Sequence, residues 1–174
     1  MIWVGAGIFA VAVAANCASV HAQKRHRVYD RLGRWGWPAH IVLLVLVWGA
    51  AVVCLALAGD KATWPMAGWV RPIGWVVGAL ASLIFGTALR ELGLQSLFNG
   101  NFFGRGAYSD HGIYRRLANP MYDAFLLAFV SIALRRADAV YFLLAVESLI
   151  LLNVIEARVE RVEGVDAPPW WRIV

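Results

Sequence analysis

The 174-residue chain is too apolar for an ordinary soluble protein. Hydrophobic residues make up 61% of it and charged residues 16%, whereas soluble domains are roughly half apolar and a quarter charged. The length suits one domain. The net charge of +5 calls for no nucleic acid, because basic residues beside membrane spans account for it. Cys17 and Cys54 fall within apolar runs, so neither a disulfide framework nor a metal site is predicted.

Five apolar runs indicate an all-α, polytopic membrane bundle of about five transmembrane helices. The first three approach the ~20 residues needed to cross a hydrocarbon core. The fourth, of about fourteen residues, covers only ~21 Å, so we expect it to begin earlier or to tilt. Residues 135–138 allow only a tight antiparallel hairpin between runs four and five. The runs are residues 2–20, 35–58, 67–89, 121–134 and 139–155.

The first run is expected to be a spanning helix, because no basic residue precedes it as a signal peptide requires. Small residues at four-residue spacing predict close-packing ridges on spans one and three. These are Ala6, Ala10, Ala14 and Ala18, and Gly74, Gly78, Ser82 and Gly86.

The distribution of Lys and Arg predicts the orientation, because short basic loops stay cytoplasmic. We therefore expect a multi-pass integral membrane protein with its N-terminus outside and its C-terminus cytoplasmic. The predicted cytoplasmic segments hold Lys24, Arg25, Arg27, Arg31, Arg34, Arg90, Arg105, Arg115, Arg116, Arg158, Arg161 and Arg172. The opposite side holds only Lys61, Arg71, Arg135 and Arg136.

Most of the polar residues that could carry chemistry begin in a loop of about thirty residues, 90–119. A loop of this length usually indicates a function. At its end Asn119 suits an N-cap and Pro120 a first helical residue. The start of that helix would face the cytoplasm and attract a carboxylate or phosphate. A capped helix without a ligand is the alternative.

Polar residues continue beyond run five. In an α-helix Asn153, Glu156, Glu160 and Glu163 would form one stripe, next to the foot of the hairpin that carries Asn119. Two further ionisable groups, Asp123 and Glu147, lie within the runs, where charges usually face a cavity or partner. Glu147 is thus a candidate for substrate contact, with a protonated, internally hydrogen-bonded Glu as the alternative.

At these residues the chain resembles the small membrane methyltransferases related to isoprenylcysteine carboxyl methyltransferase and the phospholipid methyltransferases. Their opening Gly-Pro/Ile-Tyr-Arg matches residues 112–115, and their Asn-Pro-x-Tyr core matches residues 119–122. Glu156 and Gly164 match a later Glu and Gly. Ala118, Ala124 and Ile155 stand where the family pattern has Arg, Gly and a first Glu.

The resemblance implies that S-adenosylmethionine binds between the two feet of the hairpin and methylates a lipophilic acceptor from the bilayer. It also implies a division into residues 1–90, three N-terminal spans, and residues 91–174, the cofactor-binding region. Arg115, Glu147 and Glu156 are candidate catalytic residues. The implied cofactor-binding residues are His111, Gly112, Tyr114, Arg115, Asn119, Pro120, Tyr122 and Glu156.

Two other functions stay open. Membrane reductases that use NADPH have a similar bundle, although the Asn-Pro-Met-Tyr core favours the methyltransferases. A non-catalytic assembly factor or small permease is the other possibility, because this chain lacks the Arg and the first Glu of the family motif. The sequence leaves the methyl acceptor open among a prenylated thiol, a phospholipid amine and a small hydrophobic metabolite.

Overall fold

A computed structural model describes residues 2–58, 63–105, 109, 111–117 and 119–160. Its main elements are helices, and no strand is found within these residues. The long helices are α1 (Ile2–His26), α2 (Gly36–Ala58), α3 (Val70–Leu92), α4 (Pro120–Arg136) and α5 (Ala139–Ile150). Shorter turns are η1 (Val28–Trp35), η2 (Leu94–Phe98), η3 (Gly100–Phe103), η4 (Gly112–Arg115), the π-helix η5 (Leu151–Glu156) and α6 (Ala157–Glu160).

The predicted five-helix membrane bundle is confirmed. Three helical stretches are long and apolar enough to cross a membrane: Trp3–His26, Val28–Ala56 and Val70–Leu92. The fourth run is extended at both ends, because Pro120 opens α4 and the helix continues through Arg136 for 17 residues. Run five is a shorter apolar helix, Ala139–Ile155, whose last part is π-helical.

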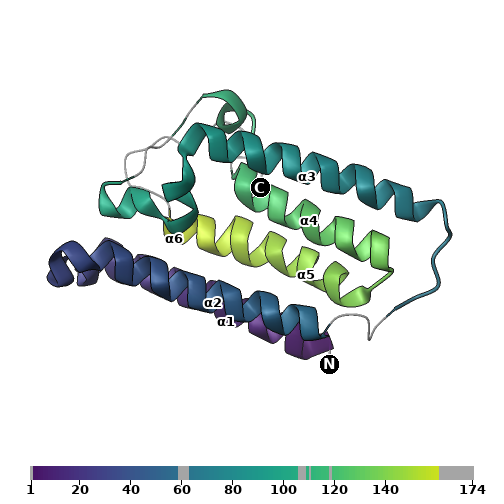
Figure 1. The fold of residues 1–174 in the computed structure, drawn as a ribbon, viewed down its shortest axis with the longest axis horizontal. Helices are drawn as coiled ribbons and strands as arrows, with labels where there is room; N and C mark the ends of the chain where they lie inside the picture. Colours follow the sequence, from purple (N-terminus) through teal and green to yellow (C-terminus); the bar gives the residue numbers. More distant parts are fainter. Residues whose placement is uncertain (1, 59–62, 106–108, 110, 118, 161–174) are drawn as a thin grey trace.

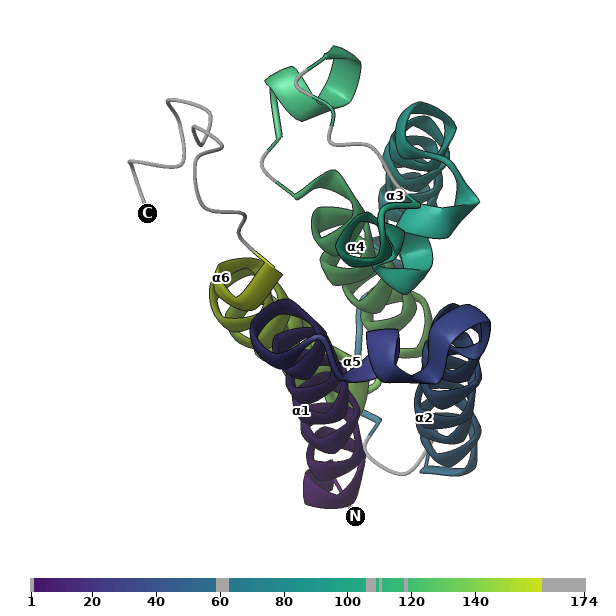
Figure 2. The same ribbon diagram turned by 90° about the vertical axis from the view of Figure 1, so that its left-hand side faces the viewer.

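The helices pack as a series of neighbours in the order α2, α1, α5, α4, α3. Figure 1 shows α3, α4 and α5 side by side with α1 and α2 below them, and Figure 2 shows the same order end-on. The core lies where α1, α2 and α5 meet, and its buried side chains include Phe9, Val13, Leu55 and Leu144.

The two ridges predicted from small residues differ in outcome. Gly74 and Gly78 on α3 do face α4, where the Ser131 hydroxyl donates to the Gly74 carbonyl oxygen over 2.7 Å. Ser82 and Gly86 are exposed, so only the first half of that ridge packs closely. The prediction that the alanine ridge on α1 packs closely against another helix is wrong, because Ala14 and Ala18 are exposed. The buried face of α1 is the one that carries Phe9, because the larger side chains fill the space against α5 and α2.

The hairpin between α4 and α5 is confirmed. Ala137 ends α4 in the left-handed conformation, with φ +52°. Asp138 then caps α5 by accepting a hydrogen bond from the Val140 amide over 2.9 Å, and its side chain is fully buried. The α4 N-terminus and the α5 C-terminus are therefore at the same end of the bundle, the left-hand end of Figure 1.

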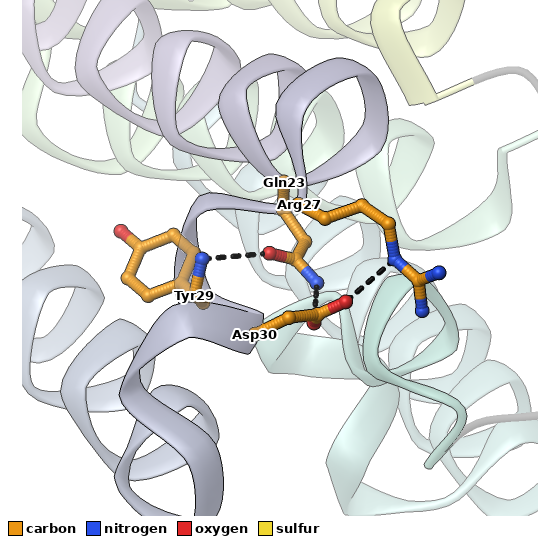
Figure 3. Close-up of polar contacts among 4 residues, drawn as sticks. All are labelled: Gln23, Arg27, Tyr29 and Asp30. Atoms are coloured by element: carbon orange, nitrogen blue, oxygen red, sulfur yellow. Dashed lines mark hydrogen bonds and ion pairs between the residues drawn. The ribbon is translucent and has the colours of Figure 1, made fainter.

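A polar junction turns the chain from α1 into η1 at this end. The Gln23 side chain accepts from the Tyr29 amide over 3.0 Å and donates to Asp30 over 2.8 Å. Asp30 also pairs with Arg27, whose backbone is left-handed with φ +49°. Figure 3 shows these contacts. Together they satisfy polar groups at the end of α1 and so define where the first span stops.

Beside this junction a buried polar cluster joins α1, α2 and the loop after α3. The Ser19 hydroxyl lies 2.9 Å from Nδ1 of the fully buried His40 and 2.6 Å from the Tyr29 hydroxyl. From the loop, Asn99 donates to Asn16 over 3.1 Å. These contacts attach the loop to the N-terminal helices, because each buried polar group would cost free energy without its partner.

Candidate functional site

The first turn of α4 and the short helix η4 form the centre of the candidate site. Pro120 is buried at the first helical position of α4, where its fixed φ suits the helix and its missing N–H costs nothing. Asn119 occupies the N-cap position as predicted, but its side chain makes no capping hydrogen bond. Its carbonyl oxygen instead accepts from the Asp123 amide over 2.9 Å.

Glu91 is a candidate site residue that is absent from the set predicted from the sequence. It lies in the last turn of α3, and its Oε1 accepts a hydrogen bond from the Ile113 amide over 3.1 Å. Its other oxygen, Oε2, is buried without a hydrogen-bond partner among the described residues. A sequence signal was present, because Glu91 is the first acidic residue after an apolar span and the second residue of the predicted loop 90–119.

The Glu91 carboxylate also explains why residue 112 is a glycine. Gly112 has φ +54°, a conformation that glycine adopts without a steric penalty. A Cβ atom placed on Gly112 would overlap the Glu91 carboxylate. Two independent constraints therefore favour glycine at position 112. One is the positive φ of the backbone, and the other is the close approach of the Glu91 carboxylate.

Tyr114 lies next to this contact and is buried, with 9% of its surface exposed. Its hydroxyl is buried without a hydrogen-bond partner among the described residues. Burial, and then the negative charge of Glu91, raise the pKa of Tyr114 well above its ordinary value. The phenol thus stays protonated at neutral pH and can donate a hydrogen bond.

The other predicted site residues occupy three settings. His111 and Arg115 are exposed around η4. Tyr122 is partly buried and packs against the hydrophobic core, so it serves at least the fold. Glu156 ends the π-helix at the same end of the bundle, while its side chain lies outside the described part of the chain.

The acidic stripe predicted after run five does not follow the expected geometry. Its spacing assumed an α-helix with 100° per residue, whereas Leu151–Glu156 is π-helical and each residue there turns through a smaller angle. The side chains of Glu156 and Glu160, and all of Glu163, lie outside the described part of the chain, so the stripe itself stays a prediction. Glu147 is half-buried in α5, and its Oε2 has no partner among the described residues. It is more than two helical turns before Glu156 and lies within the bundle.

Basic residues gather at the end of the bundle that holds this site. Lys24 and Arg25 lie in the last turn of α1, Arg90 lies in the last turn of α3, and Arg115 lies in η4. At the opposite end, the last turn of α4 holds Arg135 and Arg136. The predicted cytoplasmic basic residues of α1, α3 and η4 thus lie at one end of the bundle, and those at the end of α4 lie at the other.

An all-helical bundle with three membrane-length helices and a polar site at one end defines an integral membrane protein. A family model described as phospholipid methyltransferase matches residues 70–162. This match covers more than half of the chain, which therefore belongs to the phospholipid methyltransferase family, a family of membrane methyltransferases. No curated protein and no solved structure matches the chain.

Proposed function

We propose that this protein transfers a methyl group from S-adenosylmethionine to a lipophilic acceptor at the cytoplasmic face of the membrane. The observation that carries the proposal is the extent of the family match. Residues 70–162 run from α3 through η4 and the hairpin to α6, and these elements supply the polar end of the bundle.

The residues at this end suit the cofactor chemically. S-adenosylmethionine carries a sulfonium, an ammonium group and a carboxylate. Glu91 Oε2 and the Tyr114 hydroxyl, both buried and without partners among the described residues, complement a cationic group with N–H donors. Arg115 is exposed beside them, and its guanidinium suits a carboxylate. We propose that His111, Gly112, Asn119, Pro120, Tyr122 and Glu156 form the remaining walls.

When bound, the cofactor supplies an electrophilic methyl group on sulfur. The protein's share of the work is then to align the acceptor with that methyl group and to keep water away. Glu91 fixes the backbone of η4 through the Ile113 amide, which keeps the Tyr114 ring in its buried position. A carboxylate or thiolate acceptor needs no general base.

The proposed orientation rests on the basic residues at the site end, because Lys and Arg in short loops are retained in the cytoplasm. The cofactor is found in that compartment. The acceptor is proposed to enter from the bilayer, because the outer faces of α3 and α5 are apolar and exposed. Their exposed side chains include Val76, Leu80, Leu83, Phe142, Val146 and Leu149.

The test is the thermal stability of the detergent-purified protein with S-adenosylmethionine, with its demethylated product or with NADPH. A ligand at 100 times its dissociation constant should add ~2.7 kcal/mol to the free energy of unfolding. We expect the first two ligands to stabilise the protein and NADPH not to. Stabilisation by NADPH alone would support a reductase, and no response to any ligand would support a non-catalytic protein.

Variants localise the response. Glu156→Ala and Tyr122→Ala are expected to abolish stabilisation by the cofactor, whereas Cys17→Ala is expected to keep it. Because Tyr122 also packs against the core, its variant must be shown to fold without ligand. Intact binding in both of the first two variants would contradict the proposed site.

A further inference from the structure

An apolar groove lies between α3 and α4, and it runs from Ala124 and Phe125, one turn after the candidate site, toward the opposite end of the helices. It encloses about 570 Å³. Small side chains on both helices, Ala79 and Ser82 on α3 and Ala128 on α4, leave this space open. Phe85 and Phe125 stand at its inner end with their ring centroids 5.7 Å apart.

Arg135 closes the other end of the groove and is held there by two contacts. Its aliphatic part packs over Gly74, where an added Cβ would come within 2.7 Å of Arg135 Cγ. Its guanidinium stacks on the Trp75 ring at 4.1 Å from the centroid. No carboxylate lies within ion-pair distance of it among the described residues, and its Nε is buried without a hydrogen-bond partner there. The groove thus ends at a fixed positive charge that no described acidic residue balances.

The position and length of the groove fit a lipid of the leaflet at this end. Trp75 is 66% exposed, as is typical of a Trp at the membrane interface. From Trp75 to Phe85 the α3 backbone rises about 15 Å, which is half of a hydrocarbon core about 30 Å thick. A chain that starts at the level of Arg135 would therefore reach the bilayer midplane inside the groove.

We propose that the groove binds one acyl chain of an anionic phospholipid whose phosphate pairs with Arg135. The guanidinium offers the bidentate donor geometry that phosphate accepts, and the aliphatic chain covers apolar surface on both helices. This lipid belongs to the leaflet opposite the candidate methyl-transfer site, since Arg135 ends α4 and Pro120 begins it. It is a bound lipid separate from the acceptor, and the inference is independent of the proposed reaction.

The experiment is native mass spectrometry of the full-length protein, released from detergent after titration with phosphatidylglycerol or phosphatidylcholine. Wild-type protein should retain one phosphatidylglycerol with clear preference over phosphatidylcholine. Arg135→Gln should lower that affinity about tenfold, the effect of losing one charge-assisted contact. Arg136→Gln is the matched control, because this neighbour is exposed and its guanidinium donates to the Tyr141 hydroxyl instead.

A second variant tests the groove without changing charge. Ala128→Phe fills the space, so it should lose the retained lipid while Arg135 stays in place. Equal losses in the Arg135 and Arg136 variants would overturn the proposal, because they would indicate general charge attraction. Retention of the lipid by Ala128→Phe would overturn it too. A lipid-free wild-type dimer that Ala128→Phe dissociates would assign the groove to a second copy of the chain and would also overturn it.

Discussion

The Glu91 carboxylate occupies the space that a side chain at position 112 would need, and it accepts the hydrogen bond of the next amide, Ile113. The C-terminal end of α3 and the start of the family motif are therefore joined at one point. Any change that moves this carboxylate should move the motif with it.

Gly112→Ala should destabilise the protein more than the same change at Gly104. Both glycines have positive φ, and only at Gly112 does an added Cβ meet another group. The backbone penalty of about 1–2 kcal/mol is common to both variants. Gly112→Ala should lose a further ~1.5–3 kcal/mol because it displaces a charged hydrogen-bond acceptor. Unfolding by SDS in mixed micelles measures the difference.

A double-mutant cycle assigns that extra cost. In a Glu91→Ala background the two glycine variants should differ little, because the group that meets the new Cβ is gone. An undiminished difference in that background would show that Glu91 is not the cause.

Stability at alkaline pH should depend on Tyr114. Burial and the Glu91 charge raise the pKa of Tyr114 in the folded protein, whereas in the unfolded chain the phenol ionises near pH 10. The stability contributed by the neutral phenol is therefore complete below about pH 10 and is lost as the pH rises toward the folded pKa. The free energy of unfolding should fall more steeply between about pH 10 and pH 12 in wild type than in Tyr114→Phe. Identical slopes would contradict this assignment.

Asp138→Ala should destabilise the hairpin of α4 and α5. The buried carboxylate caps α5 through the Val140 amide, and replacing an N-cap by Ala costs about 1 kcal/mol. Asp138→Asn keeps a side-chain oxygen acceptor and should recover most of that loss. Thermal unfolding of the two variants in one detergent provides the comparison, and an Asn variant as unstable as the Ala variant would argue against the cap.

The orientation of the bundle is open to labelling in intact cells. After Cys17 and Cys54 are replaced by Ala, Arg115→Cys and Trp69→Cys each place one exposed thiol at opposite ends of the bundle. A membrane-impermeant maleimide added outside should label only position 69, because the basic end is expected in the cytoplasm. Labelling at position 115 instead would reverse the proposed topology and exclude a cytoplasmic site.

The features that the sequence by itself determined are local ones. Apolar run length predicted the spans, because a bilayer demands about twenty apolar residues of a helix. The tight segment 135–138 predicted the hairpin, and Pro120 predicted the start of α4, since each acts through its own backbone. The motif at residues 112–122 led to the family by resemblance, and the family match confirmed it.

What only the tertiary structure decided depends on contacts between distant residues. Glu91 meets Gly112 and Ile113 across a loop, and Asn99 reaches Asn16 from 83 positions along the chain. Nothing in the sequence between them encodes such a pairing. The π-helical segment likewise departs from the α-helical spacing that the predicted acidic stripe assumed. A prediction from periodicity assumes that the helix is regular, and it does not say which neighbouring helix a side chain will face. Packing against other helices decides both the helix geometry and the neighbour.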